Sequence, residues 1–329
     1  MPRGDVLAIV WSPHEARTAA YADWLDAELH NVHFLREKRP WLAPIKYVMQ
    51  WAATWWLLAR KRPRVVYVTN SPPVAGLCVL GYSALTPTRF VLDTHPPGLY
   101  NRRWAWSRPI QRFTARRASM NVIDQERFAE LFRSWGVPVL VLENPPKRSL
   151  PQRGVEPDPE RPTVTYVGTF GADEPIDELL AAARSLPEVR FNVLGDTALA
   201  RRSWIDQAPT NVAFTGYLLR EQYWERIYEA HAVIVLTTHR YSLLGGAQDG
   251  LFADTPLILS DQPTLREYFT AGAIFTPNTG EGIAEAVRTS VAEQSRLREE
   301  IRALRQQTAS RWQQAFTALR THVDELAGR

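Results

Sequence analysis

The residues best suited to chemistry lie in the segment "HRYSLLGGAQDGLFADTPLILSD", His239 to Asp261, where a glycine pair precedes an acid. Gly245 and Gly246 stand between an apolar run typical of a strand and one typical of a helix. Backbone N–H groups at a helix N-terminus can hold an anion such as a diphosphate. The carboxylate of Asp249, one turn further on, can accept hydrogen bonds from the paired hydroxyls of a ribose. Alternatively, the glycines form a flexible loop and Asp249 is a first-turn acid favoured by the helix dipole.

Strands that alternate with helices must position this segment. In the first half of the chain, short apolar runs rich in β-branched residues predict strands at "VLAIVW", "VVYVTN", "RFVLDTH" and "ASMNVID", with helical patterns between them. Strand, helix and strand in repetition are typical of a parallel α/β sheet with helices on both faces. The stretch "NPPKRSLPQRGVEPDPERP" is rich in proline and charge, has no periodicity, and predicts a linker.

The same alternation resumes after the linker. Strands are predicted at "TVTYVG", "RFNVLG", "NVAFTG", "AVIVLTT", "PLILS" and "AIFTP", and helices at "PIDELLAAARSL", "LREQYWERIYEAH", from about Ala247, and throughout the tail. Ligands of open parallel sheets bind at the carboxyl ends of the strands. The residues to inspect are therefore those that follow strands, namely Ser12 to His14, Asn70 to Pro73, Asp93 to Pro97, Gly168 to Gly171, Gly195, Asp196, Gly216 and Thr237 to Asp249.

Composition narrows the class of protein. The 329 residues are 45% hydrophobic and 22% charged, with a net charge of +4, which predicts a sizeable core rather than disorder. A single cysteine, Cys78, excludes an intrachain disulfide framework and a thiolate metal site. The N-terminal apolar run is too short for a signal peptide, and no uninterrupted apolar stretch has the length of a membrane span. A cytoplasmic location is predicted. The sequence has no metalloprotease motif, no P-loop and no G-x-S-x-G nucleophile elbow. It also has no G-x-G-x-x-G motif, which disfavours NAD binding.

The second half resembles a known family. The stretches "YVGTF", "PIDELLAAARSLPEVRFNVLGD", "NVAFTGYLLREQYWERIYEAHAVIVLTT" and "DGLFADTPLILSD" resemble the donor domain of bacterial family 4 glycosyltransferases, which have the GT-B fold. "VTNSPPVAGLCVLGYSAL" and "RFVLDTH" resemble the acceptor domain of members that make surface polysaccharides, and "TASRWQQAFTALRTHVDEL" resembles their closing helix. The resemblance implies two Rossmann-like domains facing across a cleft: an acceptor domain at 1–150, a donor domain at 151–310, and a helix at 311–329 packing back towards the N-terminal domain.

The resemblance also implies roles for individual residues. Counting back from Pro256 places the second acid of the family motif at Asp249, which would bind the ribose, while the first acid would fall at Tyr241. Gly245 and Gly246 would bind the diphosphate. The full set of predicted donor-binding residues is Asp249, Gly245, Gly246, Ala247, Thr169, Gly168, Asp196, Gly216, His239 and Arg240. No metal and no cofactor are expected, and the donor is a UDP- or GDP-linked sugar as substrate.

One departure from the family pattern concerns positive charge. The family usually has an arginine and a lysine facing the diphosphate, at positions that hold Thr169 and Glu174 in this chain. A leaving diphosphate needs positive groups or N–H dipoles. The candidate substitutes are His239, Arg240, Arg201, Arg202 and the glycine amides.

In the acceptor half, His95 ends a predicted strand, where the family has a histidine or acid near the transferred sugar. His95 is therefore the predicted catalytic residue. The alternative is a strand-end histidine bound only to the backbone. The predicted acceptor-binding residues are His14, Ser12, Asn70 and Ser71.

The stretch "RPWLAPIKYVMQWAATWWLLARKRPR" interleaves tryptophans with basic residues. Ile45, Val48, Ala52, Trp55 and Ala59 share one helical face. Two interpretations remain open: a buried helix packed on the sheet, or a face at a membrane surface, with tryptophan at the interface and basic residues on lipid phosphates.

The resemblance thus implies a retaining glycosyltransferase of hexosyltransferase type that acts in polysaccharide biosynthesis. Its partners would be a nucleotide sugar, a glycan or polyprenyl-linked acceptor and an anionic membrane surface at the inner face of the cell membrane, without nucleic acid. The alternatives are a catalytically silent GT-B subunit that binds a partner, and a GT-B sugar-nucleotide epimerase.

Overall fold

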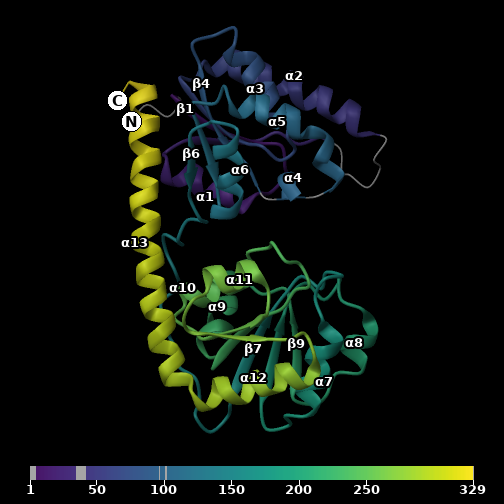
Figure 1. Ribbon diagram of the computed structural model, residues 1–329. Coiled ribbons are helices and arrows are strands. Elements are labelled where there is room, and N and C mark those ends of the chain that lie inside the picture. Colours follow the sequence, from purple (N-terminus) through teal and green to yellow (C-terminus); the bar gives the residue numbers. More distant parts are fainter. Residues whose placement is uncertain (1–4, 35–41, 96, 101, 329) are drawn as a thin grey trace. The chain divides into compact units, whose positions relative to one another are not determined.

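The computed structural model describes residues 5–34, 42–95, 97–100 and 102–328, and these divide into two compact units (Figure 1). Unit 1 comprises Met1–Pro145 and Arg311–Arg329, and unit 2 comprises Pro146–Ser310. Each unit is built on one six-stranded sheet in which every strand pair is parallel. Helices cover both faces of each sheet, as the sequence predicts for an α/β protein.

The sheet of unit 1 has the strand order β2-β1-β3-β4-β5-β6. Its elements are β1 (Val6–Val10), α1 (Ala16–Trp24), β2 (Glu28–Asn31), α2 (Ala43–Lys61), β3 (Val65–Thr69), α3 (Val74–Ser83), β4 (Arg89–Asp93), α4 (Pro97–Tyr100), the 3₁₀ helix η2 (Arg102–Ser107), α5 (Arg108–Ala115), β5 (Met120–Ile123), α6 (Glu126–Ser134) and β6 (Val139–Val141).

The sheet of unit 2 has the order β12-β11-β10-β7-β8-β9. Its elements are β7 (Thr163–Val167), α7 (Ile176–Arg184), β8 (Arg190–Leu194), α8 (Arg202–Asp206), β9 (Val212–Gly216), α9 (Arg220–Tyr228), β10 (Ala232–Val235), α10 (Gly245–Phe252), β11 (Leu257–Ser260), α11 (Pro263–Tyr268), β12 (Ala273–Thr276), α12 (Gly280–Ala292) and the long helix α13 (Gln294–Ala327).

The structure confirms the predicted strands. They are continuous apolar runs because helices cover both faces of each sheet, so their residues need not alternate between apolar and polar. Every residue of β1 and β3 is buried, for example. The sequence did not reveal β2, "ELHN", or β6, "VLV". Both are short edge strands whose residues are at least partly exposed, and they depend on pairing with β1 and β5 rather than on a pattern of their own.

Helix α2 buries the face opposite to the one its apolar periodicity suggests. Its buried side includes Lys46, Gln50 and Thr54. The Gln50 amide donates to the Val32 carbonyl at 2.7 Å, and Trp11 Nε1 donates to Thr54 Oγ1 at 2.9 Å, so most of this polar face is satisfied within the protein. Ile45, Val48, Met49 and Trp56 are exposed instead. The helix itself does pack on unit 1, because Leu57 and Leu58 belong to its core and Trp51 and Trp55 pack against that core, whereas most of the predicted apolar face is exposed.

Helix α13 contributes to both hydrophobic cores. Its first half places Ile301 and Leu304 in a core cluster of unit 2, and its second half places Trp312, Phe316, Leu319 and Val323 in a core cluster of unit 1. Trp312 stacks on Phe316 with ring centroids 4.7 Å apart, and its ring also contacts Trp24 at 4.7 Å. The part of α13 from Arg311 onwards is thus an integral layer of unit 1.

The predicted linker is docked on unit 2 rather than free. Arg153 donates to the backbone carbonyls of Ala253 and Tyr228, and Leu150 and Val155 pack against the core. Among the described residues, no helix is both long enough and apolar enough to cross a membrane.

Replacing Trp312 with alanine tests the anchoring of α13 on unit 1. The side chain is 3% exposed, so its removal leaves a cavity and should cost about 3–5 kcal/mol of unfolding free energy. Urea unfolding monitored by circular dichroism measures the loss. The matched control is Gln313→Ala, an exposed neighbour on the same helix, which should change stability by less than about 0.5 kcal/mol. Equal effects of the two substitutions would contradict this packing.

Candidate functional site

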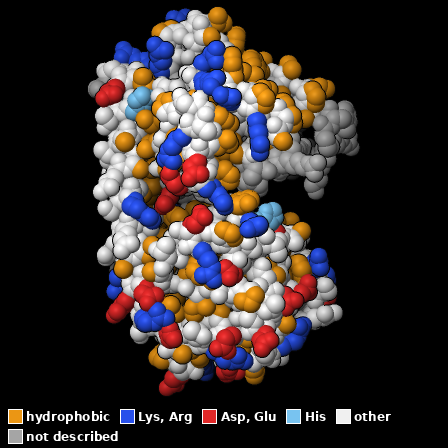
Figure 2. Space-filling model, viewed as in Figure 1, with side chains coloured by type: hydrophobic (Ala, Val, Ile, Leu, Met, Phe, Trp, Pro, Cys, Tyr) orange, Lys and Arg blue, Asp and Glu red, His pale blue; other side chains and the backbone are white. Residues whose placement is uncertain are grey.

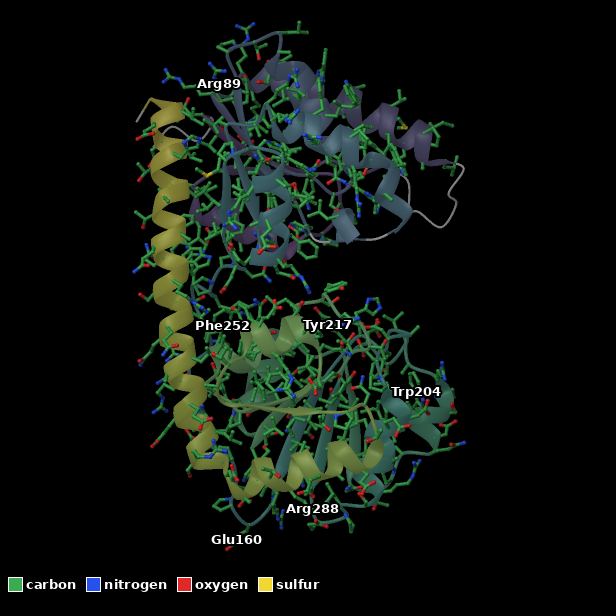
Figure 3. All side chains as sticks on the ribbon, in the orientation of Figure 1. Arg89, Glu160, Trp204, Tyr217, Phe252 and Arg288 are labelled. Carbon is green, nitrogen blue, oxygen red and sulfur yellow. The ribbon has the colours of Figure 1, made fainter. Side chains whose placement is uncertain are left out.

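A pocket of about 300 Å³ lies at the carboxyl ends of β7, β8 and β9 in unit 2. Because these neighbouring strands are parallel, their carboxyl ends meet at one edge, the expected place for a ligand. The lining residues are Val167, Gly168, Thr169, Leu194, Gly195, Asp196, Leu199, Gly216, Tyr217, Leu218 and Tyr223. Four predicted donor-binding residues, Gly168, Thr169, Asp196 and Gly216, line it together. Figure 3 shows Tyr217 at this edge of unit 2, with Glu160 and Arg288 at the opposite end.

The walls of this pocket are largely apolar and are shaped by glycine. Gly195 has φ +155°, and a Cβ there would lie 2.6 Å from the Gly168 carbonyl oxygen and 2.7 Å from the Phe170 ring. Only glycine lets the loop after β8 approach the loop after β7 this closely. The tyrosine rings along the pocket offer flat surface on which a planar ring can stack, and the leucines add apolar contact.

Asp249 borders the pocket through Tyr223. Tyr223 lines the pocket, and its hydroxyl donates to Asp249 Oδ2 at 2.7 Å. Burial, together with the Asp249 carboxylate, raises the pKa of Tyr223 far above its ordinary value, so this hydroxyl stays protonated. Lys147 Nζ lies 3.4 Å from Asp249 Oδ1. Sequence reasoning missed both Tyr223 and Lys147. Asp249 is the fifth residue of α10, beyond the first turn, so the alternative of a first-turn acid does not hold.

The remaining predicted donor residues surround the start of α10. Gly245 is exposed and begins the helix, and a Cβ on Gly246 would lie 2.7 Å from Val167 Cγ1, so the helix start lies against the end of β7. The side chain of Ala247 is buried in the core, which leaves only its backbone for a ligand. His239 and Arg240 are exposed on the preceding loop, and His239 Nε2 lies 3.9 Å from Asp173 Oδ2.

The arginines suggested as replacements for the missing positive charges of the family pattern do not line the pocket. Arg201 lies 3.9 Å from Asp177, Arg202 pairs with Asp206, and neither residue lines the pocket. Glu174, where the family pattern has a lysine, turns its carboxylate back onto its own loop. Asp196 Oδ1 accepts a hydrogen bond from the Ala198 amide and so also shapes its own turn.

In unit 1, His95 belongs to a buried charge cluster at the carboxyl ends of β4 and β5. Arg17 on α1 lies 3.3 Å from Asp93 and also donates to Asn144 and to the Leu142 carbonyl. His95 Nε2 lies 3.5 Å from Asp93 Oδ2, and the His95 side chain remains 20% exposed. His95 is thus held by a carboxylate and not only by the backbone.

The groups of this cluster shift the pKa values of one another. Burial alone would raise the pKa of Asp93, but the Arg17 guanidinium and the His95 imidazole outweigh burial and hold it well below its usual range. Burial lowers the pKa of His95, yet the hydrogen bonding and charge of Asp93 raise it above its ordinary value. Burial raises the pKa of Asp124, which the sequence did not single out.

The predicted acceptor residues lie on this same edge, since they follow β1 and β3. His14 is exposed, and its carbonyl accepts from the Ser12 hydroxyl at 3.0 Å. Asn70 is buried and donates to Thr94 Oγ1 at 3.3 Å, and Ser71 is half-buried next to it. Asn70 therefore has a structural role in connecting the loops after β3 and β4.

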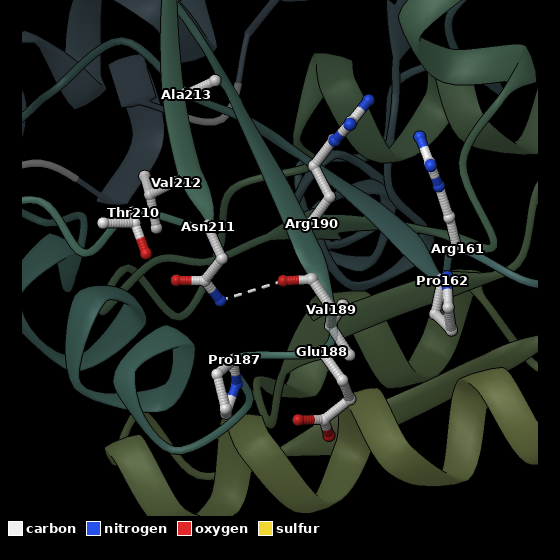
Figure 4. Close-up of a pocket in the computed structure, with 10 residues that line it drawn as sticks. All are labelled: Arg161, Pro162, Pro187, Glu188, Val189, Arg190, Thr210, Asn211, Val212 and Ala213. Carbon is white, nitrogen blue, oxygen red and sulfur yellow. Dashed lines mark hydrogen bonds between the residues drawn. The ribbon is translucent and has the colours of Figure 1, made fainter.

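A second pocket of unit 2, about 340 Å³, lies at the opposite edge of the sheet (Figure 4). Its central polar group is the amide of Asn211, which donates to the carbonyls of Ala183, Leu186 and Val189. With those donors used, Asn211 has a structural role. In the described part of the chain no group of three or more His, Cys, Asp or Glu side chains is placed to hold a metal ion.

Comparisons with known proteins agree with this architecture. The model of the family described as "Glycosyl transferases group 1" matches residues 161–293. The solved structure of Anabaena Alr3699/HepE in complex with UDP-glucose superimposes with a TM-score of 0.69 at 11% identity, over 96% of this chain and 99% of that one. A sucrose-phosphate synthase from Thermosynechococcus elongatus gives 0.67 at 14% identity, over 96% and 100%. A putative UDP-N-acetylglucosamine 2-epimerase from Listeria monocytogenes gives 0.69 at 11%, over 98% and 97%. No curated protein matches the chain.

The predicted fold class is confirmed: the chain has the α/β GT-B fold, with two parallel six-stranded sheets and a long C-terminal helix. The matched domain contains the pocket, Tyr223 and Asp249. Together, the family match and the fold support a glycosyltransferase of the GT-B fold.

The His95–Asp93 contact predicts a pH-dependent contribution to stability. Because the folded-state pKa of His95 is raised, its contribution is complete below the unfolded pKa, about 6.5, and is lost as pH rises through the folded value. His95→Gln should therefore destabilise the protein more at about pH 5.5 than at about pH 8.5. Denaturant unfolding at both pH values measures this, with His14→Gln, on an exposed loop of the same unit, as the control. A larger loss at the higher pH would contradict the pairing.

Proposed function

We propose that the protein is a glycosyltransferase that moves a sugar from a nucleotide-sugar donor to a hydroxyl of a glycan or polyprenyl-linked acceptor. The observation that carries this proposal is the strand-end pocket of unit 2, where apolar walls adjoin the Tyr223–Asp249 pair inside the matched domain. Stacking surface next to a hydrogen-bonded carboxylate suits a nucleoside, whose base is flat and whose ribose carries a diol.

In this proposal unit 2 is the donor domain and unit 1 the acceptor domain. The base lies between the leucines and tyrosines of the pocket, and Asp249 accepts hydrogen bonds from the ribose hydroxyls. Structures of the Anabaena protein that contain UDP or UDP-glucose support a uridine nucleotide as the first donor to test. His95 and the strand-end residues of unit 1 receive the acceptor and the transferred sugar. No metal is assigned a role.

The proposed chemistry retains the anomeric configuration. The bond between the anomeric carbon and the leaving phosphate oxygen breaks, the acceptor hydroxyl oxygen bonds to that carbon on the same face, and its proton passes to the leaving phosphate oxygen. Positioning and electrostatic stabilisation carry the rate, without a protein nucleophile. In this proposal the phosphate charge is opposed by Lys147, which lies beside Asp249, by His239, which lies beside Asp173, and by the amides at the start of α10.

One observation favours a second candidate, a catalytically silent GT-B subunit. Glu174 places a carboxylate at the loop after β7, where a positive group would be expected to face a diphosphate. The epimerase neighbour keeps sugar-nucleotide epimerisation as a third candidate.

A thermal-shift screen with UDP, GDP, ADP, dTDP and their sugars distinguishes a nucleotide-binding protein from a silent subunit. A ligand at a hundred times its Kd adds roughly 2.7 kcal/mol of stability. No response to any nucleotide would reject the transferase proposal.

Asp249→Asn tests the ribose contact. Removing this charged acceptor should weaken nucleotide binding by roughly 1.5–3 kcal/mol, about tenfold to a hundredfold in Kd. Calorimetry with one nucleotide on both proteins measures the change. Asp261→Asn is a matched control, because Asp261 follows β11 on the same sheet edge, lies outside the pocket lining and pairs with Arg266. Unchanged affinity in Asp249→Asn would remove Asp249 from the site.

The exposed face of α2 supports a membrane-surface role for unit 1. Val48 is 68% and Trp56 is 64% exposed, while polar residues of the same helix point inwards. Such an outward apolar face is typical of helices that lie in the membrane interface. Figure 2 shows hydrophobic side chains over this part of unit 1 with basic ones among them.

Charge in this region is almost entirely positive. From Lys38 to Ile123 the sequence has fourteen Lys and Arg residues and one acid, Asp93, which is buried. Helices α2 and α5 both pack on α3. A groove of about 630 Å³ beside α5 is lined by Arg108, Arg112, Arg116 and Arg117 with Phe113 and Trp135. None of these four arginines has a carboxylate partner among the described residues. We propose that unit 1 docks on anionic lipid at the inner face of the cell membrane.

Liposome flotation tests this docking. The protein should float with vesicles containing anionic lipid at low salt and less at high salt, because salt screens the charge attraction. The double variant Val48→Glu/Trp56→Glu should lose flotation. Leu85→Glu is the control, since Leu85 is equally exposed and apolar but lies outside α2. Flotation of the double variant at the wild-type level would contradict docking through α2.

A further inference from the structure

The loop after β7 encloses the carboxylate of Glu174. Glu174 Oε1 accepts from the Thr169 amide at 2.9 Å and from the Thr169 hydroxyl at 2.7 Å. Glu174 Oε2 accepts from the Phe170 amide at 2.9 Å and from the buried Tyr166 hydroxyl at 2.8 Å. Four donors from three residues thus converge on one carboxylate. We call the donors of Tyr166, Thr169 and Phe170 the Glu174 cradle.

The backbone of the cradle is shaped for an anion. Phe170 has φ +58°, the left-handed conformation that turns successive N–H groups towards one point, as in anion-binding nests. A Cβ on Gly168 would lie 2.4 Å from Glu174 Oε2 and 2.6 Å from the Tyr166 hydroxyl oxygen. The carboxylate therefore occupies space that exists only because residue 168 is glycine.

The cradle is at the edge of the candidate nucleotide pocket. Gly168 and Thr169 line that pocket, and Gly246 at the start of α10 lies against Val167, the residue before them. A ligand in the pocket that extends an anionic group towards α10 would meet these amides already engaged with a carboxylate. Asp173, with its side chain 31% exposed, adds a second negative group beside the cradle.

We propose that Glu174 is a built-in competitor for the anionic group of the ligand and thereby determines the specificity of this pocket. The nucleoside part of a ligand binds without hindrance. The phosphates of the ligand add little binding free energy until the Glu174 carboxylate leaves the cradle. Like charges close together at a partly buried site oppose each other, so the carboxylate both fills the donors and repels a second anion. The part of this inference that concerns nucleotides rests on the proposed function, whereas the cradle itself does not.

The first experiment tests the cradle without any nucleotide. Glu174→Ala empties the four donors, so the variant should have a lower Tm than the wild type, and inorganic phosphate should restore part of the difference by occupying them. The wild type should not respond to phosphate. Asp173→Asn, which removes a neighbouring charge and leaves the cradle filled, is the control and should not respond either. Amide NMR shifts of Thr169 and Phe170 in the variant locate the bound phosphate. Equal responses of the two proteins, or no response of the variant, would reject the cradle as an anion site.

The second experiment compares uridine with UDP by calorimetry. In the wild type the two Kd values should be similar. In Glu174→Gln, which keeps the side-chain size if the alanine variant folds poorly, UDP should bind about tenfold more tightly while uridine is unchanged. Weaker or unaltered UDP binding in this variant would overturn the competitor role. If neither ligand binds either protein, the proposed function fails, and the phosphate experiment still decides the cradle.

Discussion

Every described strand pairing in both sheets is parallel, and this constraint decides where function can lie. Parallel strands need a crossover after each strand, so all carboxyl ends of a sheet meet at one edge and all loops that can vary freely gather there. The pocket between Gly168, Gly195 and Gly216 is a direct result, because three consecutive strands deliver one glycine each to the same edge. The His95 cluster of unit 1 follows from the same rule.

The two units stabilise the carboxylates at their strand ends differently. In unit 1, Asp93 is fully buried and is balanced by the Arg17 guanidinium. The partly exposed His95 lies beside the same carboxylate. In unit 2, Glu174 is held by hydroxyl and amide donors alone, and Asp249 by a tyrosine hydroxyl and a half-exposed lysine. The Glu174 carboxylate, which is held by neutral donors, keeps its negative field, so this part of the edge opposes additional anions.

Sequence patterns predicted what depends on local chemistry. Long apolar runs gave the central strands, and the position of Asp249 relative to Pro256 gave a residue that does border the pocket. The edge strands β2 and β6 carry no such pattern, since pairing with a neighbour defines them. Tyr223 lies 26 residues before Asp249 in sequence, and only the packing of α9 near α10 brings the two together. The inward polar face of α2 could not be predicted from the sequence either, because its hydrogen-bond partners, such as Val32 and Trp11, come from other parts of the chain.

Glu174 shows how far substitution patterns can mislead without geometry. From the sequence alone, an acid in place of a lysine indicates a degraded phosphate site. A degraded site, however, would need no special accommodation for the new side chain. Here the carboxylate has four donors, a left-handed Phe170 and a Gly168 whose missing Cβ makes room for it. Backbone in the left-handed region costs free energy in a residue other than glycine, and it persists only where its surroundings hold it. The cradle is therefore an organised part of the loop, and any ligand that binds in the pocket meets the negative charge of Glu174.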